Sequence, residues 1–459
     1  MIVMKFGGTS VQDSSAIEQT AEIVRGRLNS RPAVVVSAMA RVTDGLLKAA
    51  SLAQSRKAES ADAVIDELRD RHLTASAVLL EGRGEELDEV EHSLNEYFDE
   101  LQGLLRSIAT LGELTPRSQD AITSFGERLS SLIVAAAYRV RGIPAELVDS
   151  RQLLVTDSNF NRAAPDMSET ERLASRVLKP MIESGRVPVA QGFIGSNPDG
   201  ITTTIGRGGG DYSAAILGAA IGVDSIEIWT DVDGLMTADP RIVADAKRIR
   251  VVSFSEAAEL SYFGAKVLHP STVVPAIQRS IPVHIYNTRN PSSEGTLIVA
   301  QPRRTTSTIK SIAAKRGITI VNVASTRMIM AHGFLRKIFE VFDRHQTSID
   351  VVTTAEASVS MTVDTAEHLD AIRRDLGDAG AVSVEPGKAI VCVVGDNLKF
   401  TPGVAARLFR AIGDINVNMV SQGASEINLT FVINEHEVEQ AVRLLHLEFF
   451  KECDPEVFA

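Results

Sequence analysis

The sequence predicts an α/β protein in which a mainly parallel sheet, sandwiched by helices, is followed by two smaller α/β modules. A strand, a helix and a second strand fit within residues 2–39, and such a βαβ unit implies a parallel sheet. Glycine-rich turns that carry cationic side chains follow several later strands. Beyond residue 308 a helix–strand–strand pattern occurs twice, which indicates two copies of a βαββ-type module.

Length and composition limit the possible class of protein. A chain of 459 residues is too long for one ordinary core and predicts two to four domains. The net charge of −12 argues against a general nucleic-acid binder, whose surface is basic. Cys392 and Cys453 give neither a disulfide framework nor a set of metal ligands. The sequence lacks a signal-peptide pattern and an apolar run long enough to span a membrane, so we expect a cytoplasmic protein with no membrane partner.

The opening residues combine a buried strand, a glycine turn and a lysine. Ile2–Met4 is an apolar run typical of a sheet interior, and Lys5 follows it next to a Gly-Gly turn. Thr9 and Ser10 suit the N-cap of a helix, and residues 16–28 have helical spacing. A glycine turn, a helix N-terminus and one lysine can together hold an oxyanion. Taken alone, this segment could instead be a tight turn that binds no ligand.

Apolar runs and helical spacing predict the other elements of the first domain. Residues 57–140 are expected to be mostly helical, with Glu127 near a helix start. Strands are expected at 33–39, 145–148, 187–190, 225–229, 282–286 and 295–299, and further helices at 214–221 and 255–263.

The second half of the chain has the repeat. Helices are expected to begin at Gly333 and Gly403, each followed by short strands. The predicted organisation is a catalytic domain over 1–300, a polar linker over 301–308, and two repeats over 309–385 and 386–459. The first strand, 309–315, could pair with the second repeat. Paired regulatory domains are favoured, and two unrelated α/β segments are the alternative.

Charged residues in the glycine-rich turns favour phosphoryl transfer. No P-loop motif is present, and the Gly206–Asp211 cluster has aspartate where a dinucleotide fingerprint has its last glycine. Lys5, Arg207 and Lys266 supply cations, and phosphoryl transfer needs mainly positioning and charge neutralisation. Arg207 and Glu127 could bind a zwitterion, with the guanidinium holding a carboxylate and the glutamate an ammonium.

Five motifs follow one another along the chain: Lys5–Val11, Ser124–Glu127, Gly206–Asp211, Trp229–Gly234 and Phe263–Pro270. In order and composition they resemble the motifs of aspartate kinases. The repeat, with Ser421–Asn428, is similar to the tandem ACT domains of that family. The resemblance covers essentially the whole chain. It implies an amino-acid kinase fold followed by two ferredoxin-like βαββαβ ACT domains.

The resemblance also implies the reaction and its residues. ATP and L-aspartate would give 4-phospho-L-aspartate, the first step toward lysine, threonine and methionine, with Mg²⁺ bridging the phosphates and no protein metal ligand. Lys5, Asp211 and Lys266 would be catalytic: Lys5 neutralises the moving phosphoryl group, Asp211 holds the lysines, and Lys266 contacts the nucleotide. The residues implied for ATP are Lys5, Gly7, Gly8 (whose N–H groups would be donors), Thr230, Asp231, Met236, Arg241 and Lys266. Those implied for aspartate are Ser37, Thr43, Glu127 and Arg207.

Two residues depart from the family pattern. Gly210 stands where serine is frequent, which removes a hydroxyl near the substrate. Met236 stands where a tyrosine commonly lies near the nucleotide. Neither change removes a charge that the chemistry needs, so activity is expected.

The regulatory half resembles that of lysine-sensitive relatives. The residues implied to bind the effector are Met328, Ala331, Gly333, Phe334, Leu335 and Asp350. Asp350, expected beside a helix N-terminus, would hold the effector's ammonium. Ala331 replaces a serine, so lysine is the first expectation and threonine the second. A homodimer or larger homo-oligomer through the ACT domains is implied, and the chain's end just past the second repeat leads us to expect a monofunctional enzyme.

Two other functions remain open at the sequence level. Another amino-acid kinase would phosphorylate glutamate, acetylglutamate or a carbamate, but the Ser124–Glu127 and Gly206–Asp211 motifs argue against it. A catalytically inactive amino-acid sensor would keep the fold and the ACT domains, but the retained charged residues argue against that.

Overall fold

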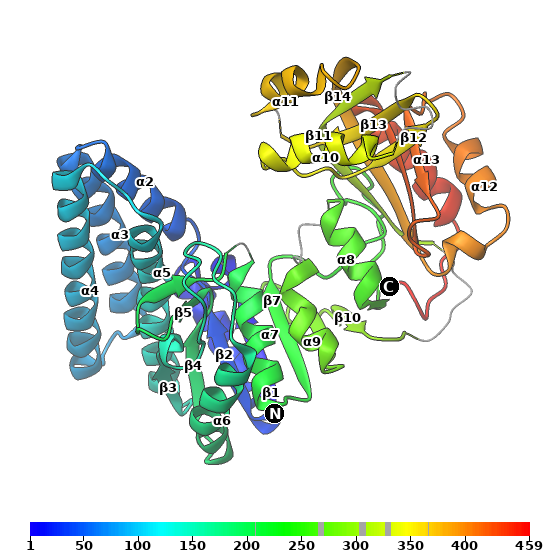
Figure 1. Ribbon diagram of the computed structural model, residues 1–459. Coiled ribbons are helices and arrows are strands. Elements are labelled where there is room, and N and C mark those ends of the chain that lie inside the picture. Colours follow the sequence, from blue (N-terminus) through cyan, green and yellow to red (C-terminus); the bar gives the residue numbers. More distant parts are fainter. Residues whose placement is uncertain (207, 265–269, 303–308, 326–331, 366) are drawn as a thin grey trace. The chain divides into compact units, whose positions relative to one another are not determined.

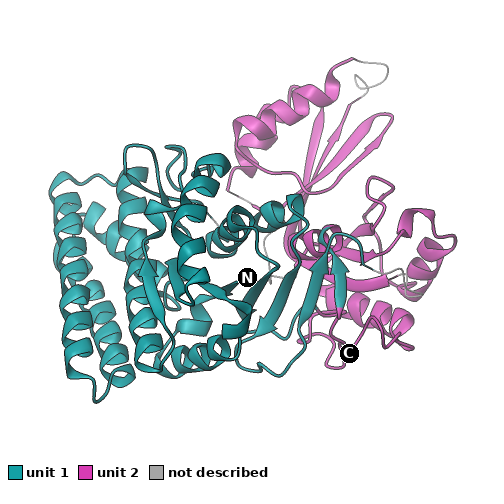
Figure 2. Ribbon diagram, turned by 90° about the horizontal axis from the view of Figure 1, so that it is seen from below, with its two compact units in different colours: residues 1–235, 251–254, 267–302 teal, residues 236–250, 255–266, 303–459 magenta. Residues whose placement is uncertain are grey.

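The computed structural model describes residues 1–206, 208–264, 270–302, 309–325, 332–365 and 367–459 (Figure 1). The chain divides into two compact units (Figure 2). Unit 1 contains Met1–Leu235, Val251–Phe254 and Val267–Pro302, and unit 2 contains Met236–Arg250, Ser255–Lys266 and Arg303–Ala459. Two segments before residue 300 thus pack with the C-terminal residues: the Arg250 N–H, for example, donates to the Val457 carbonyl at 2.8 Å.

Unit 1 is built on an eight-stranded sheet among its described residues, with the strand order β3-β4-β2-β1-β7-β9-β10-β8. The strands are β1 Ile2–Phe6, β2 Pro32–Val36, β3 Ala145–Val148, β4 Val187–Gln191, β7 Ser225–Thr230, β8 Val251–Ser253, β9 Val283–Asn287 and β10 Thr296–Val299. Neighbouring strands are parallel except for β9 and β10. β5 Ile194–Ser196 and β6 Thr202–Thr204 form a separate hairpin. The predicted mainly parallel sheet is confirmed.

Helices cover both faces of this sheet, and α2, α3 and α4 stand side by side at one edge of unit 1 (Figure 1). The helices are α1 Ser14–Arg25, α2 Val42–Gln54, α3 Ala58–Leu79, α4 Gly84–Leu111, α5 Pro116–Val140, α6 Met167–Glu183, α7 Gly209–Ile221 and α9 Val274–Gln278. Alternate side chains of a strand point to opposite faces. Met4 and Phe6 of β1 therefore join the core formed with α1 and α5, whereas Lys5 points toward α7.

Strand β1 lies at the centre of the sheet because all five of its residues are buried. It pairs with β2 on one side and β7 on the other. The chain therefore builds the sheet outward from β1 in both directions, with β2, β4 and β3 on one side and β7, β9, β10 and β8 on the other. Ligands of open α/β sheets bind at the carboxyl ends of the strands at such a switch point. A ligand site is therefore expected at the residues that follow Phe6, Val36 and Thr230.

Two predicted helix starts are wrong in detail. Thr9 and Ser10 lie in a short 3-10 helix, Gly8–Val11, which has no side-chain cap. Helix α1 begins after Asp13 instead, whose carboxylate accepts from the Ala16 N–H at 2.9 Å. Glu127 is not near a helix start but in the middle of α5, because the apolar face of that helix continues on both sides of it.

Unit 2 contains a six-stranded sheet among its described residues, in the order β12-β13-β11-β14-β16-β15. The strands are β11 Ile309–Ala324, β12 Val352–Ala355, β13 Ser358–Val363, β14 Ala381–Gly395, β15 Met419–Gln422 and β16 Asn428–Asn434. Its helices are α10 Phe334–Arg344, α11 Leu369–Leu376, α12 Val404–Ala411 and α13 Val438–Phe449, together with α8 Phe254–Tyr262 from Ser255 onward.

The two repeats of unit 2 share their long strands. Residues 319–324 of β11 pair with β13 and with the start of β14, whereas residues 309–315 pair with the end of β14, whose other edge pairs with β16. Each repeat therefore contributes two strands of its own and uses part of both β11 and β14. This arrangement confirms the predicted pair of ferredoxin-like modules.

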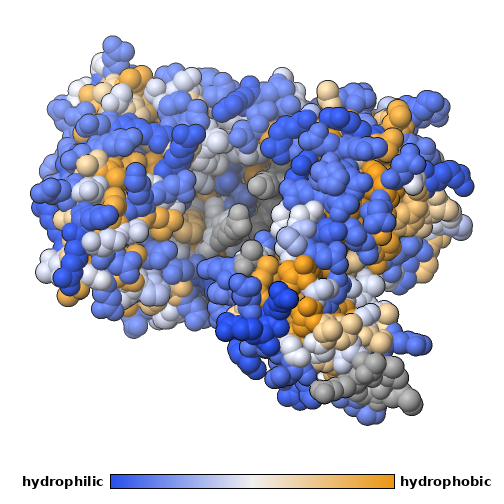
Figure 3. Space-filling model, turned by 90° about the horizontal axis from the view of Figure 1, so that it is seen from above, coloured by the Kyte–Doolittle hydropathy of each residue, from blue (hydrophilic) through white to orange (hydrophobic). Residues whose placement is uncertain are grey.

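The face shown in Figure 3 is mostly hydrophilic, with hydrophobic residues in separate patches. Across the described residues, no helix combines the length and the apolar character needed to span a lipid bilayer.

Candidate active site

Lys5 and Asp211 form an ion pair at the carboxyl end of β1. The Lys5 Nζ lies 2.7 Å from Asp211 Oδ1, and both side chains are largely buried. Asp211 lies in the first turn of α7, the helix that begins within the glycine cluster. The pair therefore sets a cation at the switch point of the sheet, with the carboxylate fixing its position.

Glu127 places a buried carboxylate at the same cavity. Its Oε1 accepts from the Ala38 N–H at 3.2 Å, whereas its Oε2 has no hydrogen-bond partner among the described residues. Burial raises the pKa of Glu127 to about 8, although the Ala38 N–H and the Lys5 charge pull it down. A buried carboxylate with one orphaned oxygen is costly unless a ligand supplies a donor or a positive charge.

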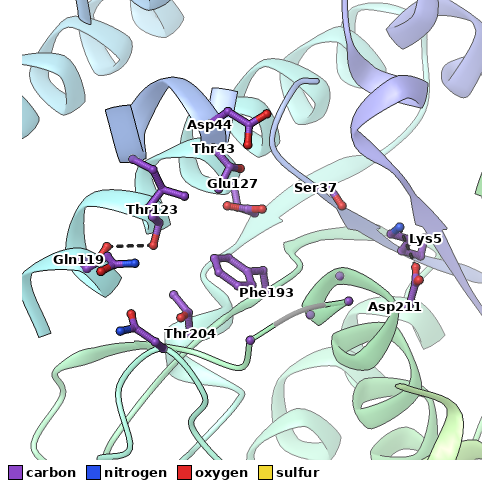
Figure 4. A pocket seen from close by; sticks show the side chains of 16 residues that line it. Lys5, Ser37, Thr43, Asp44, Gln119, Thr123, Glu127, Phe193, Thr204 and Asp211 are labelled. Carbon is purple, nitrogen blue, oxygen red and sulfur yellow. Dashed lines mark hydrogen bonds and ion pairs between the residues drawn. The ribbon is translucent and has the colours of Figure 1, made fainter. Parts of the chain in front are cut away.

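A cavity of about 620 Å³ brings the two features together. In Figure 4 the Glu127 carboxylate and the Lys5–Asp211 pair lie on either side of Ser37. The predicted residues Lys5, Ser37, Thr43, Glu127 and Asp211 all line this cavity. The structure thus brings together three of the four residues implied for aspartate and two of the three implied for catalysis; the others, Arg207 and Lys266, lie outside the described residues.

Several lining residues were not predicted from the sequence: Asp44, Leu47, Gln119, Thr123, Asn161, Phe193 and Thr204. Phe193 is the one with a recognisable signal, since it stands between glycines after strand β4. Its φ of 66° is left-handed, which is rare for a bulky residue and often marks a functional position. Its N–H donates to Ser213 Oγ at 2.9 Å, which ties the turn to α7.

Asp120 holds one wall of the cavity. The carboxylate is fully buried and accepts from the N–H groups of Asn161 and Thr204 and from the Thr204 hydroxyl, at 2.7–3.0 Å. Both partners line the cavity. Because Asp120 belongs to α5, it fixes this wall to the helix that carries Glu127.

Replacing Asp120 with asparagine should destabilise this wall. The asparagine NH₂ group would face the N–H and hydroxyl groups that donate to the Asp120 carboxylate, so at least one hydrogen bond would be lost. Loss of a hydrogen bond to a buried charge costs about 2 kcal/mol. We expect a thermal midpoint lowered by several degrees and a raised KM for the acceptor. The matched control is Asp88→Asn on the exposed surface of α4. Equal midpoints for the two variants in thermal unfolding would contradict this role.

The structure explains why glycine, and not serine, stands at position 210. A Cβ at Gly210 would lie 2.8 Å from Ser37 Oγ and 3.1 Å from Lys5 Cε, both closer than ordinary contact. A serine would therefore require Ser37 or Lys5 to move. Glycine here is consistent with the present position of the Lys5 ammonium.

Two of the predicted nucleotide residues, Thr230 and Asp231, lie on the β7 side of β1. Thr230 ends strand β7 and Asp231 follows it, and both line a second cavity of about 270 Å³ together with Thr9 and Ser10. Gly7 needs a correction, because its N–H donates to the Trp229 carbonyl at 3.1 Å and is not a free phosphate donor in this backbone. Gly8 opens the 3-10 helix after β1.

The other predicted nucleotide residues lie in unit 2. Met236 begins the segment that packs with the C-terminal residues, and its carbonyl accepts from the Ser311 hydroxyl at 2.7 Å. Arg241 is exposed and pairs with Asp239 at 2.6 Å. Hydrogen bonding to Asp239 and its charge raise the pKa of Arg241.

Four of the six predicted effector residues lie among the described residues. Gly333, with a left-handed φ of 77°, precedes α10, and Phe334 and Leu335 open that helix. Asp350 lies before β12, and its buried carboxylate is paired with Lys315 at 3.0 Å. Met328 and Ala331 lie outside the described residues.

Among the described residues, no group of three or more His, Cys, Asp or Glu side chains is placed to hold a metal ion.

Comparison with known proteins gives the family. Residues 1–287 match the amino acid kinase family, and residues 391–449 match an ACT domain. The chain is 36% identical to lysine-sensitive aspartokinase 3 of Escherichia coli K12, over 98% of this chain and 99% of the relative.

Two crystal structures are similar over nearly all of the chain. E. coli aspartokinase III with aspartate and ADP (R-state) has a TM-score of 0.85 at 34% identity, covering 98% of this chain and 100% of the other. The same enzyme with lysine and aspartate (T-state) has a TM-score of 0.83 at 35% identity, covering 98% and 99%. The predicted resemblance is confirmed, and the chain belongs to the aspartokinases, within the amino acid kinase family.

Proposed function

We propose that this chain transfers the γ-phosphoryl group of ATP to the side-chain carboxylate of L-aspartate, giving 4-phospho-L-aspartate and ADP. The observation that carries the proposal is the buried, half-satisfied Glu127 carboxylate in the same cavity as the Lys5–Asp211 pair. An α-ammonium group would satisfy the orphaned oxygen of Glu127. The solved complex of the E. coli relative with aspartate and ADP supports the choice of substrates.

The geometry suggests a division of roles. The aspartate ammonium pairs with Glu127, Ser37 and Thr43 lie beside it, and Arg207 takes the α-carboxylate. An oxygen of the side-chain carboxylate attacks the γ-phosphorus while the bond to the β–γ bridging oxygen breaks. Lys5 neutralises charge on the transferring group, and Asp211 holds Lys5 in place. This acceptor is already ionised near neutral pH, so the reaction needs no general base.

The nucleotide is proposed to lie on the β7 side of β1, near Thr230 and Asp231, with the acceptor on the β2 side. Gly8, Met236, Arg241 and Lys266 complete the proposed nucleotide set. Mg²⁺ would be held by the phosphates and would supply additional charge neutralisation.

Feedback control by an end-product amino acid, with lysine favoured over threonine, completes the proposal. The name of the lysine-sensitive relative and the lysine-bound T-state structure support it. The pathway is the one leading to lysine, threonine and methionine. Assembly as a homodimer or larger homo-oligomer is proposed through the ACT repeats, since Leu335, Phe339 and Val352 of the first repeat each expose more than a third of their surface.

The test traps the acyl phosphate as its hydroxamate, with ATP and either aspartate or glutamate, and with or without lysine or threonine. We expect product with aspartate, little with glutamate, and less product when lysine is added. Product with glutamate alone would favour a different acidic acceptor. Absence of ATP turnover with every acidic acceptor would leave an inactive sensor as the better description.

A further inference from the structure

The two repeats of unit 2 hold equivalent lysines in chemically different surroundings. Lys315 of β11 lies 3.0 Å from Asp350 and 2.9 Å from Asp364. Asp350 precedes the first short strand of its repeat, and Asp364 follows the second. The first repeat therefore surrounds its lysine with two carboxylates.

In the second repeat the same places carry amides. Lys388 of β14 lies 3.0 Å from Asn434 Oδ1 and 3.4 Å from Asn418 Oδ1. Asn418 precedes β15 and Asn434 ends β16, so they correspond to Asp350 and Asp364. The half-exposed Glu385, at 3.4 Å, is the nearest carboxylate that pairs with Lys388 among the described residues.

The difference matters because Asp350 is buried, with its side chain 2% exposed. A buried carboxylate requires a cation, and its partner here is the ammonium at the end of a flexible alkyl chain. Burial alone would lower the pKa of Lys315, but its bonds to Asp364 and Asp350 raise it overall. The first repeat is thus a built ammonium site that the chain fills with its own side chain.

A third side chain links this site to helix α8. The Tyr262 hydroxyl donates to Asp350 Oδ1, and the Lys315 Nζ lies 4.9 Å from the centre of the Tyr262 ring. Tyr262 is the last residue of α8, whose first turn is tied to β11 by the buried Glu256–Lys310 pair at 2.9 Å. The chain reaches Lys266 shortly after Tyr262.

We propose that the Lys315 ammonium occupies the Asp350–Asp364 site in the absence of effector, and that a free alkylammonium effector acts by displacing it. Tyr262 then transmits the displacement of Lys315 to helix α8. This inference rests on the proposed regulation by an amino acid. It favours lysine over threonine, since lysine presents the same terminal ammonium as the side chain that it replaces. The amide-lined site around Lys388 does not offer the carboxylate pair.

The first experiment measures binding of L-lysine and L-norleucine to the full chain by titration calorimetry. Lys315→Met removes the competing ammonium and keeps most of the side-chain volume. We expect this variant to bind lysine at least tenfold more tightly than the unchanged chain, with no such gain for norleucine, which lacks the terminal ammonium. The matched control, Lys388→Met, should show no gain. An equal gain for norleucine, or none for lysine, would overturn the proposal.

Two further variants keep the test decisive. Lys315→Arg retains a cation, so it should fold and bind lysine no more tightly than the unchanged chain; tighter binding would contradict displacement. Tyr262→Phe should bind lysine within about threefold of the unchanged chain but be inhibited less at saturating lysine. Full inhibition of this variant would exclude Tyr262 as the link. Hydroxamate formation without lysine is also measured for each variant. This control distinguishes a failure of the proposed kinase activity from a failure of the proposed displacement of Lys315.

Discussion

Replacing Lys5 with methionine is expected to lower kcat for aspartyl phosphate formation by about a thousandfold. The transferring phosphoryl group spreads negative charge over its oxygens, and a fixed positive group aimed at it contributes on the order of a thousandfold in rate. Lys5 is suited to this because it is largely buried and held 2.7 Å from Asp211. Hydroxamate trapping at saturating ATP and aspartate measures the loss.

The control for this variant is Lys57→Met, on an exposed residue just before α3. It removes the same charge from the chain and should leave kcat unchanged. Thermal unfolding of both variants shows whether the fold is kept, since Lys5→Met also leaves Asp211 without its partner. A folded Lys5→Met enzyme with more than a tenth of the original kcat would rule out the proposed role.

Replacing Glu127 with glutamine should lower kcat/KM for aspartate by about a hundredfold or more. Removing one partner of a buried ion pair costs roughly 3–5 kcal/mol, which corresponds to about two to three and a half powers of ten. KM for ATP should change little, because Glu127 lies on the acceptor side of β1. Steady-state kinetics in both substrates separates the two effects, and an equal loss for ATP and aspartate would contradict the assignment.

The same variant should remove a pH dependence. With burial holding the pKa of Glu127 near 8, most of the free protein carries a protonated Glu127 at pH 7. Aspartate pairs with the ionised form, so kcat/KM should rise with pH toward 8 and then level off. In Glu127→Gln this rise should be absent. A rise that persists in the variant would belong to another group.

Stability should move in the opposite direction to activity. The folded-state pKa of about 8 lies above the ordinary value of 4.5, so the folded protein keeps a proton that the unfolded chain releases between these pH values. The free energy of unfolding contributed by Glu127 therefore falls as pH rises from 4.5 to 8. Glu127→Gln avoids this loss, and its thermal midpoint relative to the original protein should be higher at pH 8 than at pH 5. Glu67→Gln, on the exposed surface of α3, is the control and should show no such trend.

Local sequence signals predicted the elements that depend on local patterns. The apolar run of β1, the helical spacing of α3 to α5 and the alternation of β13 each specify their own structure. The motifs predicted Lys5, Glu127 and Asp211 of the cavity, and the resemblance to the family added Ser37 and Thr43.

Features that depend on distant packing could not be predicted from local signals. The raised pKa of Glu127 arises because α5 buries it beside Ala38, and nothing next to Glu127 in the sequence reveals that. Asp120 is similar, since its partners come from a loop and a hairpin that follow it by about forty residues or more. The amide of Gly7 was misjudged because its acceptor, Trp229, belongs to a strand far along the chain.

The sharing of β11 and β14 makes the regulatory half one folding unit. A chain cut near residue 386 would divide β14 and would separate residues 309–318 of β11 from their backbone partners at 388–395. The repeats should therefore unfold together, and neither should be transferable to another protein alone. In evolutionary terms, such a pair is inherited and lost as a single module, although the sequence contains two copies.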